Sequence, residues 1–174
     1  NEPDLDFNYH KKEDVLDWLE FIIKQARRYD DQHPITIGWA HIENAAYVFE
    51  SVDFVSFHYY EDFESLSNRL NLLKSEIGDM EILISEYGMT SYDGFLPGRR
   101  SETEQSEYIG TLNAFMEKEG MGGILWSLYD FDEAPSDIFG WKPWIKAMQK
   151  EFGILNADGS QKPSALQIES NFSK

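Results

Sequence analysis

The sequence predicts an α/β fold built from parallel strands, and two observations carry this prediction. Short apolar runs recur along the 174 residues, and the segments between them carry apolar residues at helical steps of three and four. Alternation of this kind is typical of βα units, whose strands pair in parallel. We therefore expect four βα units.

The strands are expected at residues 35–39, 54–59, 82–85 and 124–128. The first run follows Pro34 and the fourth follows a pair of glycines, and such residues commonly mark the loop before a strand. All four runs are nearly continuous in apolar residues, which is typical of strands covered on both faces. The pattern predicts a buried sheet.

The helices are expected at residues 12–29 and 63–77 and from Ser101 onward. The second ends at Gly78, a common residue just past a helix end. Ser101 and Glu104 have the spacing of a capping box, and the inner face of that helix should carry Tyr108, Leu112 and Phe115. Shorter helices are expected at 43–50, 143–152 and 163–172.

Four βα units are too few to close a barrel. A (β/α)8 barrel has eight strands and typically about 250 residues, and an open parallel sheet of four strands leaves two edges uncovered. We therefore expect residues 1–174 to be a single partial domain, the C-terminal half of a (β/α)8 barrel with strands 5 to 8 and their helices. A missing N-terminal half-barrel or a second copy of the chain would complete it.

The composition narrows the classes of partner. A hydrophobic content of 41%, with 15% aromatic residues, is enough for a packed core. The formal charge of −17 argues against nucleic acid and against an anionic membrane surface, because both would repel the chain. Neutral and cationic partners stay open. The chain has no cysteine, which excludes disulfides and thiolate metal sites, and no apolar run long enough to predict a membrane span.

Residues suited to sugar chemistry stand at the predicted strand ends, where barrel enzymes carry their catalytic groups: Trp39, His58, Tyr60, Glu86 and Trp126. A second glutamate, Glu2, lies in the opening Asn1-Glu2-Pro3. Two facing carboxylates are the arrangement by which a glycosidic bond is cleaved. The sequence therefore predicts a glycosidase-type site built on Glu86 and Glu2.

Four motifs in order resemble glycoside hydrolase family 5 and its clan A relatives. They are Asn1-Glu2-Pro3, His58-Tyr59-Tyr60, Ile84-Ser85-Glu86-Tyr87-Gly88 and Leu125-Trp126, which look like the ends of that family's strands four, six, seven and eight. The stretch 152–163 also resembles the family's closing segment. The resemblance covers the whole chain and implies a retaining glycosidase of the cellulase or mannanase type.

The resemblance also implies roles for the matching residues. Glu86 matches the nucleophile, Glu2 the general acid/base, and Asn1 the asparagine that holds the 2-hydroxyl of the substrate. A retaining enzyme keeps its two carboxyl groups about 5 to 5.5 Å apart, one ionised and one protonated. Two charges that close cannot both form easily, so we expect the pKa of the acid to be raised and that of the nucleophile to stay low.

Further matching residues would bind the sugar. Tyr60 matches the tyrosine that donates a hydrogen bond to the nucleophile, His58 would line the sugar site, and Trp126 would form the floor of the cleavage subsite. His58 and Trp126 each have a structural alternative, since a histidine can be a core residue and a tryptophan can plug a barrel mouth. Trp39 is one of several candidate sugar platforms for which a core position is favoured, together with Tyr87, Tyr92, Phe131, Trp141 and Trp144.

The expected function is a retaining glycoside hydrolase that cleaves a β-linked oligo- or polysaccharide, a β-glucan or a β-mannan, by double displacement with two glutamates. No cofactor is expected, and no metal, because the acids and histidines lack the local spacing of a metal site. The resemblance favours a secreted or periplasmic location, which the residues themselves leave open. Residues 1–174 alone are expected to be nearly inactive.

Two alternatives belong to other classes. One is a non-catalytic, carbohydrate-binding pseudoenzyme, which turnover of an activated aryl glycoside would exclude. The other is a half-barrel scaffold that associates through its open sheet edges, which sedimentation at two concentrations would reveal as a dimer.

Overall fold

The computed structural model describes the backbone of residues 1–172 and their side chains except those of residues 137, 138 and 170–172. The chain forms two compact units. Unit 1 comprises Asn1–Glu86 and Gly120–Ile124, and unit 2 comprises Tyr87–Glu119 and Leu125–Lys174. That residues 1–174 make one partial domain stays a prediction.

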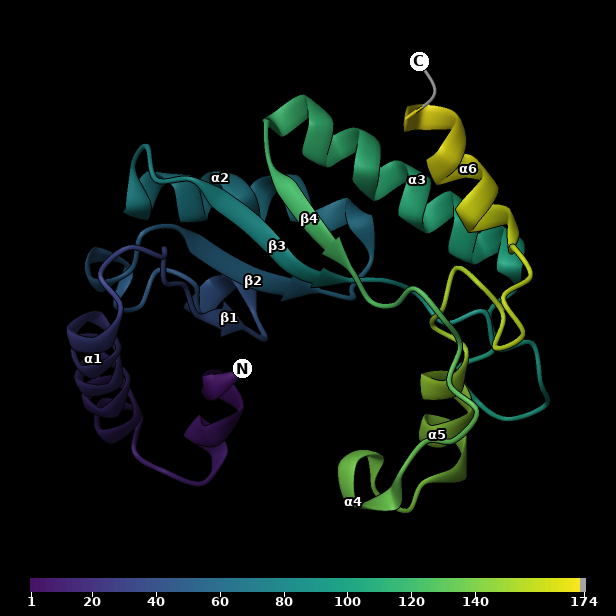
Figure 1. Cartoon of the computed structure of the whole chain (residues 1–174), viewed down its shortest axis with the longest axis horizontal. Helices are drawn as coiled ribbons and strands as arrows, with labels where there is room; N and C mark the ends of the chain where they lie inside the picture. The colour runs from purple at the N-terminus through teal and green to yellow at the C-terminus, as the bar shows by residue number, and fades with distance from the viewer. Residues whose placement is uncertain (173–174) are drawn as a thin grey trace. The chain divides into compact units, whose positions relative to one another are not determined.

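A four-stranded sheet runs in the order β1-β2-β3-β4 (Figure 1). Its strands are β1 (Gly38–Trp39), β2 (Val55–Tyr59), β3 (Ile82–Tyr87) and β4 (Gly122–Leu125). β1 and β2 are parallel, with Gly38 opposite Ser56 and Trp39 opposite Phe57. The predicted fold class is confirmed: the chain has an α/β fold with four parallel strands, as in part of a (β/α)8 barrel.

The first strand is shorter than predicted. The sequence indicated residues 35–39, but only Gly38–Trp39 form β1. In the segment before it, the amide of Ile35 donates to the carboxylate of Asp53, and the hydroxyl of Thr36 donates to the carbonyl of Phe54. These hydrogen bonds, which involve side chains, hold residues 35 and 36, which lie outside the strand itself.

The fourth strand differs in both register and burial. It was expected at 124–128 and buried, but β4 spans Gly122–Leu125 and its first three residues are exposed. β4 is the last strand in the sheet order, so one side has no partner strand among the residues described. The expectation of two covered faces is fully met only by β2, in which all five residues are buried.

The helices of unit 1 are α1 (Lys12–Tyr29) and α2 (Leu66–Ile77), with a 3-10 turn, η4 (Phe63–Ser65), before α2. α1 has the predicted bounds. The helix expected at 43–50 is wrong: two 3-10 turns, η2 (Ile42–Asn44) and η3 (Phe49–Ser51), take its place. Between them Val48 has φ 51°, a left-handed backbone that interrupts a right-handed helix. A further 3-10 turn, η1 (Pro3–Asn8), contacts α1 and β1 and was not predicted.

Unit 2 contains α3 (Glu102–Glu119), α4 (Ser136–Phe139), α5 (Pro143–Lys150) and α6 (Pro163–Phe172). The capping box before α3 is present, since the Ser101 amide donates to Glu104 Oε2 at 2.7 Å and the Glu104 amide donates to Ser101 Oγ at 3.2 Å. Leu112 and Phe115 are buried as predicted, whereas Tyr108 is only half-buried. α4 was not predicted.

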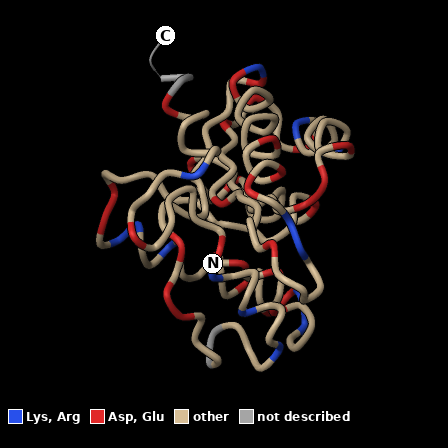
Figure 2. The backbone as a smooth tube through the Cα atoms, turned by 90° about the vertical axis from the view of Figure 1, so that its right-hand side faces the viewer, with Lys and Arg blue, Asp and Glu red and all other residues tan. Residues whose placement is uncertain are grey.

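Charge is spread along the chain. Figure 2 shows acidic segments throughout the trace with basic segments between them, in line with 32 acidic against 15 basic residues. Among residues 1–172, no helix is both long and apolar enough to cross a membrane.

Candidate active site

Glu2, His58 and Glu86 are far apart in sequence and meet in unit 1. Nδ1 of His58 lies 2.9 Å from Oε1 of Glu2 and 3.5 Å from Oε2 of Glu86. One side-chain oxygen of each glutamate and a ring nitrogen of the histidine all lie within 4.8 Å of one another. The two carboxylates selected from the sequence therefore share one site, with the imidazole in contact with both.

The parallel sheet explains this convergence. His58 is the penultimate residue of β2, and Glu86 is the penultimate residue of β3, so both side chains stand near the carboxyl ends of neighbouring strands. The residues that flank His58 in β2, Phe57 and Tyr59, are at most 1% exposed, and the His58 side chain is 2% exposed. A buried strand thus fixes the imidazole, while Glu2 and Glu86 stay half-buried and open to solvent.

Tyr60 supplies a hydrogen bond to Glu86. It directly follows β2, and its hydroxyl donates to Oε2 of Glu86 at 3.0 Å. A hydrogen bond donated to a carboxylate favours the ionised form. The hydroxyl stands where the family resemblance placed it, and its role in catalysis stays a prediction.

Gly38 brings the backbone of β1 against this site, and sequence reasoning missed it. Its carbonyl accepts a hydrogen bond from the Glu2 amide at 2.7 Å. A Cβ at position 38 would lie 2.8 Å from Nε2 of His58, closer than real side chains approach. A lone glycine within an apolar strand run often marks such a close approach, and that signal was present at 35–39.

Asp4 is a second residue that sequence reasoning missed. Its side chain is fully buried, and it accepts hydrogen bonds from the backbone amides of Ala40 and His41 at 2.8 and 3.0 Å. Burial alone would raise the pKa of Asp4, but hydrogen bonds from Asn44, Ala40 and His41 outweigh it and lower the pKa below the usual 3.8. Nothing in the sequence distinguishes Asp4 from an exposed acid.

The other predicted residues differ in position. Asn1 is exposed. Trp39 is 2% exposed and packs edge-on against Tyr47, with ring centres 5.9 Å apart, so it offers little surface to a sugar and its binding role has no support in the structure. Trp126 belongs to unit 2, where its amide donates to the carbonyl of Tyr87 and its peptide bond to Ser127 is cis. The substrate roles of all three stay predictions.

The donor set of Glu2, His58 and Glu86 could also hold a metal ion. Two carboxylate oxygens and an imidazole nitrogen suit Zn²⁺. These three residues lie on separate segments, so no local spacing in the sequence marks them as a ligand set. The absence of a metal in the working enzyme stays a prediction.

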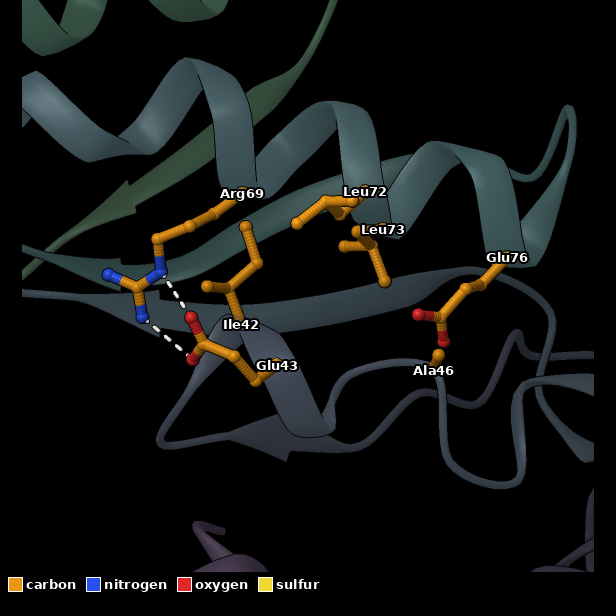
Figure 3. Close-up of a pocket in the computed structure, with 7 residues that line it drawn as sticks. All are labelled: Ile42, Glu43, Ala46, Arg69, Leu72, Leu73 and Glu76. Carbon is orange, nitrogen blue, oxygen red and sulfur yellow. Dashed lines mark hydrogen bonds and ion pairs between the residues drawn. The ribbon is translucent and has the colours of Figure 1, made fainter.

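Two hollows lie elsewhere in the described part of the chain. One, of about 110 Å³, lies in unit 1 (Figure 3). Its volume is below the ~300 Å³ of ordinary ligand pockets. Beside it, Arg69 donates a hydrogen bond to Glu43 Oε2 at 2.7 Å. The other, of about 570 Å³, lies in unit 2, where burial and the charge of Asp130 raise the pKa of Glu151. Neither contains Glu2, His58 or Glu86.

Comparisons with known proteins identify the family and the fold. A family model described as "Glycosyl hydrolase catalytic core" matches residues 11–134. A comparison with curated protein sequences finds no significant match. Among solved structures, a β-glucuronidase from Faecalibacterium prausnitzii superimposes with a TM-score of 0.76 at 20% identity, covering 99% of this chain and 30% of that one.

Two further structures extend the comparison. A β-glucuronidase from Ruminococcus gnavus gives a TM-score of 0.73 at 17% identity, with 92% of this chain and 29% of that chain covered. A glycoside hydrolase family 17 β-1,3-glucanosyltransferase from Rhizomucor miehei gives 0.66 at 17% identity, with 86% and 56% covered. At these identities the likeness establishes the fold alone. The chain spans about 30% of the length of the β-glucuronidases.

Proposed function

Because the chain belongs to the glycosyl hydrolase catalytic core family, we propose that it carries the catalytic pair of a retaining enzyme that cleaves β-linked glycans. Glu86 is the nucleophile and Glu2 the general acid/base. The separation of one oxygen of each, within 4.8 Å, carries this proposal. Retaining enzymes hold their two carboxyl groups about 5 to 5.5 Å apart, so a close approach of the two carboxylates is what this proposal requires.

The reaction proceeds in two displacements. In the first, an oxygen of Glu86 bonds to the anomeric carbon while the bond to the leaving oxygen breaks, and Glu2 gives its proton to that oxygen. In the second, Glu2 takes a proton from water, the resulting hydroxyl bonds to the anomeric carbon, and Glu86 is released. The Tyr60 hydroxyl, which donates to Glu86 at 3.0 Å, orients the carboxylate for the first step.

His58 is placed to serve both states of Glu2. Its Nδ1 is 2.9 Å from Glu2 Oε1. A neutral imidazole can accept a hydrogen bond from the protonated acid in one tautomer and donate one to the carboxylate in the other. The contact thus supports an acid that gives up its proton and then recovers one.

The substrate is a neutral β-glucan or β-mannan in this proposal. The likeness of the strand-end motifs to glycoside hydrolase family 5 favours these sugars. The formal charge of −17 also opposes the approach of anionic chains such as polyuronides. The β-glucuronidases among the similar structures do not weigh against this, because they share at most 21% identity with this chain.

Replacing the nucleophile tests the proposal. In the complete enzyme, Glu86→Gln should abolish hydrolysis while leaving glycan binding in place, because Glu86 contributes bond formation rather than affinity. Glu81→Gln is the matched control, since Glu81 is exposed just before β3. Hydrolysis by Glu86→Gln at near wild-type rates would reject the assignment.

Replacing the acid/base should affect natural and activated substrates differently. Glu2→Ala should lower kcat/KM for natural glycans by about 10²- to 10⁴-fold, the usual contribution of general acid catalysis. It should largely spare aryl glycosides with activated leaving groups, which depart without a proton. An equal loss on both substrates would reject the acid role. If the wild-type enzyme turns over neither, the pseudoenzyme alternative holds instead.

A further inference from the structure

The Asp4 carboxylate joins the segment that contains Glu2 to the loop that follows β1. Oδ1 accepts from the amide of Ala40, and Oδ2 accepts from the amide of His41 and from Nδ2 of Asn44, at 2.8 to 3.0 Å. Nδ1 of His41 lies 2.9 Å from the same Oδ2. A fully buried aspartate is rare unless its oxygens are paired. These partners of Asp4 all lie within one short segment, residues 40–44.

Glu2 itself has a backbone that relaxes unless it is held. Its φ and ψ are 49° and 47°, in the left-handed region, which is strained for a non-glycine residue. Such a conformation persists where the surrounding structure enforces it. On one side of Glu2, its own amide donates to the carbonyl of Gly38 at 2.7 Å. On the other side, beyond Pro3, stands the buried carboxylate of Asp4.

The two attachments reach the same part of the fold. Gly38 lies in β1, and Ala40 directly follows the end of that strand at Trp39. Glu2 is therefore held between two hydrogen-bonded anchors on β1 and its loop. Loss of the Asp4 anchor leaves the Glu2 backbone free to relax to the extended conformation that a residue before a proline prefers, which moves the carboxyl group away from His58.

We propose that Asp4 is a positioning residue that holds Glu2 in the geometry for proton transfer. The inference rests on the proposed function, in which Glu2 is the general acid/base. It adds a residue that contacts neither the sugar nor the reacting atoms. A shift of about 1 Å in a reacting group can cost about 10²-fold in rate, so the expected effect is large.

The test measures kcat/KM in the complete enzyme on two substrates. One is a dinitrophenyl β-glycoside, whose leaving group needs no proton, and the other is an unactivated β-linked oligosaccharide. Asp4→Asn keeps the size of the side chain but offers only one acceptor oxygen. We expect a loss of about 10²-fold on the oligosaccharide and less than about fivefold on the dinitrophenyl glycoside.

Asp53→Asn is the matched control. Asp53 also ties a neighbouring segment in unit 1, through the Ile35 amide and Arg27, but does not hold the Glu2 segment. It should lower both rates equally or not at all. Asn44→Ala removes one donor to Asp4 without altering the carboxylate, and it should shift the ratio of the two rates in the same direction by a smaller factor. This second variant decides the question if Asp4→Asn does not fold.

The outcomes separate the two proposals. If Glu2→Ala is selective for the unactivated substrate but folded Asp4→Asn and Asn44→Ala lose both rates equally, the positioning role is wrong and the proposed function stands. If Glu2→Ala itself shows no selectivity, the assignment of the acid fails first. Selective loss in both Glu2→Ala and Asp4→Asn supports the positioning role.

Discussion

Asp4 in unit 1 and Asp130 in unit 2 are both largely buried, but their partners differ in charge. The partners of Asp4 are two backbone amides, an amide side chain and the half-exposed ring of His41. Asp130 instead faces the ammonium group of Lys162 at 2.7 Å, and this lysine is 1% exposed. Amide groups and one half-exposed imidazole surround one carboxylate, and a buried ammonium group pairs with the other.

The buried pair of unit 2 belongs to a dense polar network. Lys162 also donates to Ser91 Oγ at 2.8 Å, and the amide of Gly153 donates to Asp130 at 2.9 Å. Gln105, 0% exposed, donates to the carbonyl of Gly153 and accepts from Ser164. The network joins α3 and α6 to the loops that contain Ser91, Asp130 and Gly153. The difference teaches that a buried carboxylate serves stability where a buried ammonium group depends on it, and geometry where it gathers hydrogen-bond donors from one segment.

Removing the buried cation should have the largest effect. Lys162→Met leaves the carboxylate of Asp130 without its counter-charge, and breaking a buried pair in this way typically costs about 3 to 5 kcal/mol of unfolding free energy. Urea denaturation of the chain measures it, with the exposed Lys118→Met as control. A cost below about 1 kcal/mol would contradict the comparison. Adding Asp130→Leu should recover part of the loss, because no unpaired charge then remains.

The Asp4 variant should cost less and should depend on pH. Asp4→Asn weakens hydrogen bonds from two backbone amides, for which about 1 to 3 kcal/mol is expected at neutral pH. The folded pKa of Asp4 lies below its unfolded value of 3.8, so the carboxylate stabilises the fold above that pH. That contribution is lost as the pH falls through the folded pKa. The difference in unfolding free energy between wild type and Asp4→Asn should therefore shrink below pH 3.8; a difference that grows there would contradict this.

An exposed ion pair should have the smallest effect on the unfolding free energy. Glu20 and Lys24 lie on successive turns of α1, 3.3 Å apart, with side chains 46% and 68% exposed. Glu20→Gln should change the unfolding free energy by at most about 0.5 kcal/mol, because solvent screens the pair. Thermal unfolding at low and high salt measures this. A change as large as that of Asp4→Asn would mean that burial does not separate the cases.

Features coded locally were predictable from the sequence. The bounds of α1 and the capping box at Ser101 and Glu104 depend on residues a few positions apart, and both agree with the structure. The short β1 and the broken helix at 43–50 were not predictable, because they depend on distant partners and on a left-handed valine. Asp53, for example, holds Ile35 from eighteen residues away.

The candidate site divides in the same way. Glu2, His58, Tyr60 and Glu86 were predictable because strand-end positions and motifs mark them, and they do converge. The supporting residues were not, because charged side chains are exposed by default and no local pattern marks Asp4 or Lys162 as buried. Trp39 lies in the core, the position that the sequence favoured over a sugar platform.

Gly38 has a consequence for how a mutational scan of this protein should be read. Alanine at this position adds a single methyl group, yet that group would press on a histidine ring that is itself buried between two carboxylates. The ring cannot yield without disturbing both glutamates. A scan that ranks positions by lost activity would score residue 38 beside Glu2 and Glu86, although it has no side chain to react. The substitution with the smallest added volume would thus imitate the loss of a functional group.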